Sequence, residues 1–234
     1  MERTVSTLAL NNVSYKYAKT SKYVLRNVSM DFEKGVLYSI VGKSGAGKST
    51  LLSLISGLDL PTGGAICYSG KDLSTLNRDD YRARNIGVIF QGYNLLTNCS
   101  AVENVVLSMN ISGIKSADVK TRAYKLLSDV GIDRETADRN VLQLSGGEQQ
   151  RVGIARAFSH DPDIIIADEP TGNLDGETAD GIMDIFLRLA REENKCVIIV
   201  THAREVAAYA DVVIRIANGN LQAKEGRKGV RLHD

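Results

Sequence analysis

The chain has 234 residues, 43% of them hydrophobic and 24% charged, which is the size and composition of one sizeable α/β domain. Its formal net charge is +1, so no overall field favours binding to nucleic acid or to an anionic membrane. Cys67, Cys99 and Cys196 are widely spaced and form no CxxC pair, which indicates a reducing compartment and neither a disulfide framework nor a zinc site.

The N-terminal MERTVSTLAL is too polar for a secretory signal. No stretch of the chain approaches the roughly 18 apolar residues that a membrane-spanning helix needs. We therefore expect a cytoplasmic protein that reaches a membrane only through a partner.

Short apolar runs alternate with helical patterns along the chain, which is typical of a mainly parallel sheet covered by helices. Residues 8–17, 24–35 and 63–70 instead predict short antiparallel strands and turns that form a lobe of their own. LYSIV, residues 37–41, predicts a buried strand that ends at a glycine-rich turn. The following STLLSLISG predicts a helix closed by Gly57.

The second half of the chain predicts a helical lobe and then a return to the sheet. Residues from about 92 to 160 contain no strong strand, and 117–131 carry apolar residues at helical spacing, so we expect an inserted α-helical lobe. DIIIADEP and KCVIIV predict two more buried parallel strands. The helix predicted between them, over 176–194, has one apolar face, made of Ile182, Ile185, Phe186 and Leu189.

GKSGAGKS, from Gly42, fits the phosphate-binding pattern G-x-x-x-x-G-K-[ST] and lies between a predicted strand and a predicted helix. Its glycines allow the backbone N–H groups to turn inward around a phosphate, and the helix start adds its positive dipole end. Lys48 can then reach the β- and γ-phosphates, and the Ser49 hydroxyl can bind Mg²⁺. The predicted ATP contacts of this turn are Gly42, Ser44, Gly45, Ala46, Gly47, Lys48, Ser49 and Thr50.

Four polar residues follow predicted strands, where ligands of α/β proteins bind. Asp168 can hold Mg²⁺ and Glu169 can polarise an attacking water, although a plain turn before Pro170 would also place two acids there. His202 can bond the γ-phosphate or simply open a surface helix. Gln91 can reach Mg²⁺ or the water, or be a loop residue without a role.

For two further features, the local sequence alone allows two interpretations. Tyr15 and Tyr17 would face the same side of a strand, so either can stack on adenine or belong to the core. LSGGEQQR, residues 144–151, contains a capping box, Ser145 to Glu148, that can be merely a helix start. It can also be a second anion site. One ATP cannot occupy both glycine turns of a chain unless they face each other, whereas two chains paired head to tail would bring them together.

These motifs, in this order and spacing, resemble those of the ATP-binding-cassette (ABC) ATPases, over essentially the whole chain to about Asn220. The resemblance implies a P-loop NTPase fold, with a RecA-like core, an antiparallel β lobe and the inserted helical lobe. It implies one domain over 1–222. The last dozen residues, with four Lys or Arg against two acids, predict a flexible tail over 223–234. Two copies would enclose two ATP molecules with Mg²⁺.

The resemblance also implies roles for individual residues. Lys48 and Ser49 would serve one nucleotide, while Ser145, Gly146 and Gly147 arrive from the second copy. Tyr17 would stack on adenine, and Asp175 of NLD would lie in a loop that crosses the dimer interface. The roles implied at the strand ends are the catalytic base (Glu169), the γ-phosphate switch (His202), the sensor of Mg²⁺ and partner (Gln91) and the Mg²⁺ ligand (Asp168).

RARNIGVIFQGYNLLTNCSAVENV and ADEPTGNLD are similar to the branch of macrolide exporters, lipoprotein-releasing ATPases and antimicrobial-peptide-resistance transporters. This implies an ATPase on the inner face of the membrane, driving a separate permease that exports or extracts a peptide, lipoprotein or drug. Leu95 and Leu96 would help to dock that permease. The alternative is a membrane-tethered ATPase that regulates without transporting. Soluble repair or translation members would need coiled-coil insertions or a second cassette, and a phosphotransferase would leave LSGGEQQR unexplained.

The chain departs from this branch in three places. Lys43 replaces the usual proline of the phosphate turn, Ala203 replaces the aspartate after the histidine, and NVLQLSGG lacks a proline before the glycines. None of these removes a chemical group named above, so we expect an active enzyme in which the loop around His202 behaves differently.

Overall fold

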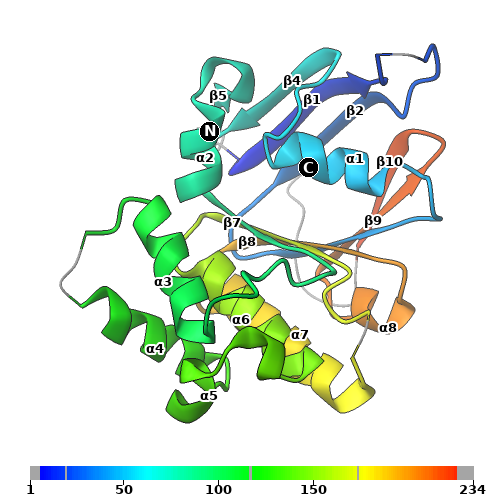
Figure 1. Cartoon of the computed structure of the whole chain (residues 1–234). Coiled ribbons are helices and arrows are strands. Elements are labelled where there is room, and N and C mark those ends of the chain that lie inside the picture. Colours follow the sequence, from blue (N-terminus) through cyan, green and yellow to red (C-terminus); the bar gives the residue numbers. More distant parts are fainter. Residues whose placement is uncertain (1–5, 19, 116–117, 173, 226–234) are drawn as a thin grey trace.

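The computed structural model describes residues 6–18, 20–115, 118–172 and 174–225. Two sheets form its framework. The first is antiparallel and four-stranded, in the order β2-β1-β4-β5, and the second has six strands in the order β10-β9-β3-β8-β7-β6. Figure 1 shows the antiparallel sheet and α1 in the upper part of the molecule, the parallel strands across its middle and α3 to α7 below them.

The antiparallel lobe confirms the strands predicted in the first seventy residues. It consists of β1 (Leu8–Tyr15), β2 (Leu25–Phe32), β4 (Gly63–Tyr68) and β5 (Lys71–Asp72). Inward-facing apolar residues of β1 and β2, with Ile66 of β4, pack on α1 (Lys48–Ile55). The helix ends as predicted, because Gly57 takes a φ of 69° that favours glycine.

The six-stranded sheet separates the two halves of the core. Its strands are β3 (Leu37–Val41), β6 (Ile86–Ile89), β7 (Ile164–Asp168), β8 (Cys196–Thr201), β9 (Val212–Ala217) and β10 (Asn220–Glu225). Ile164 and Ile166 face α1 and the antiparallel lobe, while Ile165 and Ala167 face the helices. This burial on both sides explains why the strand reads as a continuous apolar run.

Pairing of the parallel strands brings several chain positions to one edge of the sheet. Val41 of β3 pairs with Thr201 of β8, Asp168 of β7 pairs with Val200 of β8, and Ile89 of β6 pairs with Ala167 of β7. The carboxyl ends of four strands therefore lie in a row, each followed by one of the predicted site segments.

Most helices cover the side of this sheet away from α1, whereas the helix over Arg78–Arg84 packs through Tyr81 beside α1. The described residues contain α2 (Arg78–Arg84), α3 (Ala101–Ile111), α4 (Val119–Asp129), α5 (Arg134–Asp138), α6 (Gly146–Phe158), α7 (Gly176–Arg191) and α8 (Arg204–Ala207). Between 92 and 160 the described residues form helices and no strand, as predicted. The predicted apolar face of α7 is confirmed, since Ile182, Ile185, Phe186 and Leu189 are all buried. None of the helices in the described part of the chain has the length and apolar character needed to cross a membrane.

The domain boundary predicted at 222 falls within the last strand, β10. The last strand continues to Glu225, because its backbone pairs with β9 through the register Ala223–Ile214, Lys224–Val213 and Glu225–Val212. The rest of the predicted tail, 226–234, lies outside the described residues.

Candidate nucleotide-binding site

The glycine turn after β3 is shaped by close packing. A Cβ atom on Gly42 would lie 2.5 Å from Cγ2 of Ile216 and 2.8 Å from its carbonyl oxygen, so only glycine fits. The Lys48 ammonium donates to the carbonyl oxygens of Gly42 at 2.8 Å and Lys43 at 3.3 Å. The start of α1 has neither a side-chain cap nor an acidic residue in its first turn. The N–H groups and the positive dipole end at this helix start are therefore available to bind an anion.

Asp168 ends β7 opposite this turn. Burial raises the pKa of its carboxyl, the charge of Glu169 adds to the rise, and the Lys48 ammonium partly offsets it. Asp168 lies at the same sheet edge as the phosphate turn, because β8 pairs with both β3 and β7. Asp168 with the Ser49 hydroxyl and the Gln91 amide oxygen would provide oxygen donors only, the set that Mg²⁺ prefers beside substrate phosphates.

Glu169 is held by the end of the adjacent strand β8. Its φ of 46° is in the left-handed region, and its carboxylate is nearly buried. One oxygen accepts from the Thr201 hydroxyl at 3.0 Å, and the other lies 2.6 Å from Nδ1 of His202. The structure thus joins the predicted base and the predicted switch residue directly. Thr201, which no motif singled out, fixes the carboxylate.

Gln91 lies close to the turn from Glu169 to Gly172 that follows β7. Its amide nitrogen is 3.7 Å from the position that a Cβ of Gly172 would take, and the Cβ of Glu169 is at the same distance from that position. Gly172 also donates its backbone N–H to the carbonyl of Glu169 at 3.1 Å. Four predicted residues, Gln91, Asp168, Glu169 and His202, are therefore gathered at one edge of the sheet.

The rings of the two tyrosines pack edge to face, with centroids 5.2 Å apart, but the two residues differ in exposure because β1 ends at Tyr15. Tyr15 is 8% exposed and bonds Asp59, whereas Tyr17 is 51% exposed. Tyr17 lines a hollow of about 760 Å³ with residues 43–46 of the phosphate turn. Of the two, Tyr17 is thus the one available to stack on a base beside that turn, although Tyr23, 41% exposed, lines the same hollow.

Basic residues line the same hollow. Besides Lys43, they are Lys22, Arg26 and Arg215. Sequence reasoning missed these last three, because they come from separate segments and belong to no motif. Together they place positive charge beside the phosphate turn, which favours an anion there.

The second glycine turn is a capped helix start. Ser145 caps α6, accepting from the Glu148 backbone N–H at 3.3 Å, while Glu148 accepts from the Ser145 N–H at 2.7 Å. The capping-box interpretation is confirmed. A Cβ on Gly147 would lie 2.7 Å from Cγ2 of Thr178, so the glycine is needed for packing against α7.

Asp175 caps α7, the helix against which the second glycine turn packs. Both of its carboxylate oxygens bond Thr178, at 2.9 Å each, and the backbone bond from Thr178 lowers the pKa of the Asp175 carboxyl. Asn173 of the predicted NLD segment lies outside the described residues.

The two glycine turns have different neighbours in the chain. The nearest atoms to Gly42 and Gly47 belong mainly to Ile216 and Val24, whereas those nearest Gly146 and Gly147 belong to Tyr93, Leu174 and Thr178. The structure therefore does not bring Ser145 and its glycines to the chain's own phosphate turn, and the exposed Ser145 side chain is free to meet another molecule.

Ala203 leaves α8 without a side-chain cap. We expect Ala203→Asp to raise the free energy of unfolding by about 1 kcal/mol, because an aspartate at this position can accept from the free N–H groups of the first turn. Thermal unfolding would then shift upward by roughly 2–4 °C. The control is Ala208→Asp at the other end of the helix, where a negative charge opposes the dipole. An equal effect of both substitutions on melting would contradict the capping argument.

A glycine turn with lysine between a parallel strand and a helix, and an acid pair at the end of another parallel strand of the same sheet, define a P-loop nucleoside triphosphatase. The sequence profile of the ABC transporter family matches residues 25–172. The chain belongs to this family and is an ATPase of the ABC type, the ATP-binding subunit of a transporter.

Individual proteins agree with this assignment. The uncharacterized ABC transporter ATP-binding protein YclH of Bacillus subtilis is 44% identical over 94% of this chain and 98% of its own length. The lipoprotein-releasing system ATP-binding protein LolD of Idiomarina loihiensis is 39% identical over 91% of this chain and 94% of its own. Among solved structures, a dimeric post-hydrolysis state of the ATP-binding cassette MJ0796, bound to ADP and Pi, matches with a TM-score of 0.85. It is 35% identical and covers 95% of this chain and all of that one.

Proposed function

We propose that two copies of this chain pair head to tail around two ATP molecules and hydrolyse them to drive a membrane permease. The observation that carries the proposal is that the catalytic groups meet at one sheet edge, while the glycines of the exposed Ser145 turn lie against Tyr93, Leu174 and Thr178 and not against the chain's own phosphate turn. The dimeric cassette MJ0796, with its ADP and Pi, supports the same arrangement for this chain.

In the proposed site each residue has one task. Lys48 and the turn amides neutralise the phosphates, and Tyr17 stacks on adenine. Ser49, Asp168 and Gln91 would hold Mg²⁺, which supplies positive charge to the phosphate oxygens. The Glu169 carboxylate accepts a proton as the water oxygen attacks the γ-phosphorus and the bond to the β–γ bridging oxygen breaks. His202, at 2.6 Å from that carboxylate, bonds the γ-phosphate and keeps the base aligned.

The second copy completes the site in this proposal. Its Ser145 hydroxyl and the backbone of Gly146 and Gly147, at the start of α6, bind the γ-phosphate from the opposite side. Asp175, close to this turn through Thr178, reaches the interface between the copies. ATP therefore closes the pair, and loss of the γ-phosphate opens it.

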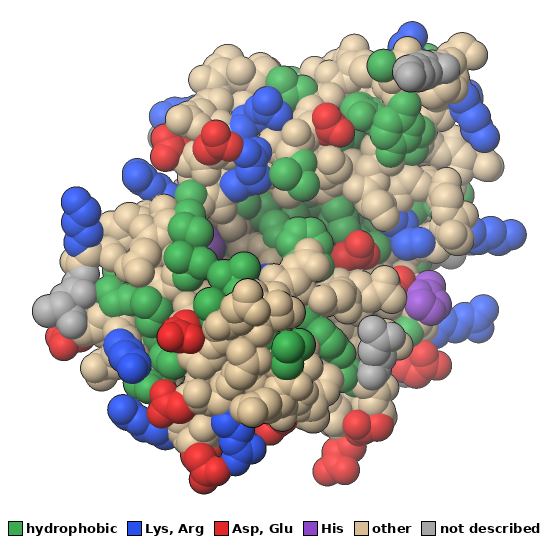
Figure 2. Space-filling model, viewed as in Figure 1, with side chains coloured by type: hydrophobic (Ala, Val, Ile, Leu, Met, Phe, Trp, Pro, Cys, Tyr) green, Lys and Arg blue, Asp and Glu red, His purple; other side chains and the backbone are tan. Residues whose placement is uncertain are grey.

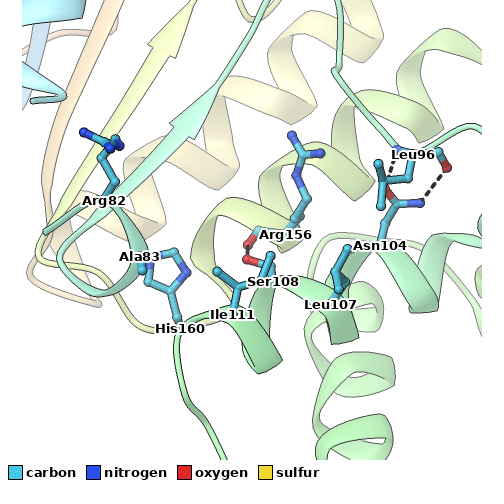
Figure 3. Close-up of a pocket in the computed structure, with 9 residues that line it drawn as sticks. All are labelled: Arg82, Ala83, Leu96, Asn104, Leu107, Ser108, Ile111, Arg156 and His160. Atoms are coloured by element: carbon cyan, nitrogen blue, oxygen red, sulfur yellow. Dashed lines mark hydrogen bonds between the residues drawn. The ribbon is translucent and has the colours of Figure 1, made fainter. Parts of the chain in front are cut away.

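A groove beside Gln91's loop suits the permease. Figure 2 shows hydrophobic side chains gathered over α3, beside a hollow that separates it from the part containing α2. The groove, of about 290 Å³, is lined by residues drawn in Figure 3 and contains no acidic side chain: Arg82, Ala83, Leu96, Asn104, Leu107, Ser108, Ile111, Arg156 and His160. Leu96 is 45% exposed and Leu95 is half-buried against the helical core. A partner can therefore contact this segment, and its docking role stays a prediction.

This proposal places the protein on the inner face of the membrane only through its permease. We propose export or extraction of a peptide, lipoprotein or drug, and the similarity to LolD, which is named for a lipoprotein-releasing system, supports the lipoprotein.

We expect Leu96→Asp combined with Leu107→Asp to abolish binding of the permease without changing ATP hydrolysis by the isolated chain. Both leucines are more than two-fifths exposed in the groove, so the substitutions introduce charge without emptying the core. The measurement is recovery of the membrane protein that co-purifies with the tagged wild-type chain, identified by mass spectrometry. Leu58→Asp is the control, because Leu58 is also an exposed leucine, at 56%, and does not line the groove.

Equal recovery by the groove variant and the control would refute the docking assignment. A transport assay with the identified membrane protein separates a transporter from a tethered regulator, because only the former moves a substrate when ATP is hydrolysed.

A further inference from the structure

The loop after Gln91 has an uncommon backbone conformation. Tyr93 and Asn94 adopt successive φ values of 59° and 47°, although neither is glycine. The left-handed region is uncommon for a side chain as bulky as tyrosine, and such a conformation persists only where neighbouring contacts hold it. The contacts made by this loop therefore indicate which residues determine the position of Gln91.

Arg156 of α6 makes the principal contacts. Its guanidinium donates to the carbonyl oxygens of both left-handed residues, at 3.2 Å to Tyr93 and through its other terminal nitrogen to Asn94. No ion pair among the described residues includes Arg156, so these two carbonyl groups take the place that a carboxylate usually has. Bonds from a charged donor are stronger than neutral ones, and a fork of two fixes direction as well as distance.

Tyr93 carries the contact to the other end of the same helix. Its hydroxyl lies 2.9 Å from the position of a Cβ on Gly146, and its carbonyl lies 3.8 Å from that of a Cβ on Gly153. These glycines are about two helical turns apart. The loop is thus attached both to the middle of α6 and to its N-terminus, next to Ser145.

The same arginine lines the groove. Figure 3 shows it beside Ser108, whose hydroxyl donates to the Arg156 carbonyl at 3.2 Å, and shows Asn104 bonded to Leu96. Asn104 is buried, donates to the Leu96 carbonyl and accepts its N–H, which fixes the far end of the loop. Arg156 therefore contacts the loop through its guanidinium and α3 through its backbone carbonyl, while Asn104 of α3 holds the far end of the loop.

We propose that Arg156 is a positioning residue for ATP hydrolysis. It holds the loop that carries Gln91 and joins that loop to the helix that begins at the Ser145 turn. A permease bound in the groove would therefore shift both the loop and the turn through the two hydrogen bonds of the Arg156 guanidinium. The link to hydrolysis rests on the function proposed above, whereas the hold on the loop does not.

The test compares Arg156→Met with wild type in two measurements. Methionine fills similar space but donates no hydrogen bond. We expect hydrogen exchange at the amides of 92–96 to accelerate at least about tenfold, with exchange in β7 unchanged, because the loop loses its external contacts. We also expect kcat to fall by about tenfold or more while KM for ATP stays within about twofold, because Gln91 is displaced but the phosphate turn is untouched.

Arg188→Met is the matched control. Arg188 also donates to a backbone carbonyl of the helical lobe, that of Asp129 at 2.9 Å, but has no contact with the loop. Unchanged loop exchange in Arg156→Met, or the same changes in Arg188→Met, would overturn the proposal. If Arg156→Met does not fold, Arg156→Lys, which keeps the charge but lacks the fork, must show the same changes in smaller degree, and wild-type values would overturn the proposal.

The proposed function and the proposed role of Arg156 can be refuted separately. A wild-type chain that hydrolyses no ATP at any concentration would refute the proposed function, while the exchange measurement would still decide whether Arg156 holds the loop. Normal hydrolysis in Arg156→Met with a loosened loop would overturn only the inference about Arg156.

Discussion

Glu169→Gln will retain ATP binding and reduce ATP turnover by about a hundredfold or more, the loss expected when a general base is removed. Glutamine has the same shape and its amide oxygen can still accept from the Thr201 hydroxyl, so the sheet edge keeps its geometry. It cannot accept the proton of the attacking water. The measurement is steady-state phosphate release, together with the affinity for ATP at equilibrium.

A second result should accompany the lost turnover. Because hydrolysis opens the proposed dimer, the Glu169→Gln chain should accumulate as a dimer with ATP, detectable by light scattering during gel filtration. Glu205→Gln, an exposed carboxylate in the first turn of α8 near His202, is the control and should turn over normally. Near-normal turnover in Glu169→Gln would remove this residue from the role of base.

The local sequence was sufficient to predict the elements of this fold because each one has a strong local cause. LYSIV is buried on both sides and ends at glycines, and the 176–194 pattern has one apolar face, so the strand and the helix follow from side-chain periodicity alone. The pairing of β3 between β8 and β9 depends instead on packing between distant segments.

The site shows the same division. Gly42, Lys48, Asp168 and Glu169 lie in motifs whose chemistry explains their spacing. The contact of Glu169 with His202, more than thirty residues away, exists only because β7 and β8 are neighbours. Similarly, alternation placed Tyr15 and Tyr17 on one face, but the strand ended between them, which local sequence did not indicate.

Ser145→Arg will leave a chain that binds ATP but neither dimerises nor hydrolyses it. Ser145 is exposed and has no contact with the chain's own phosphate turn, so binding through Lys48, Tyr17 and the turn amides should stay within about twofold of wild type. In the proposed pair, however, an arginine would project into the space that the partner's γ-phosphate must occupy. Light scattering with ATP, in the Glu169→Gln background, measures dimerisation, and phosphate release measures turnover.

Ser100→Arg separates this effect from simple loss of a helix cap. Ser100 begins α3 with the same capping box, completed by Glu103, so both substitutions should cost about 1 kcal/mol of stability. Only the change at Ser145 should abolish dimerisation and turnover, because in the proposed dimer only the Ser145 turn contacts the ATP bound by the second copy. If Ser145→Arg hydrolyses ATP with wild-type dependence on protein concentration, each chain must complete its own active site. The exposed glycine turn would then be a helix start and nothing more.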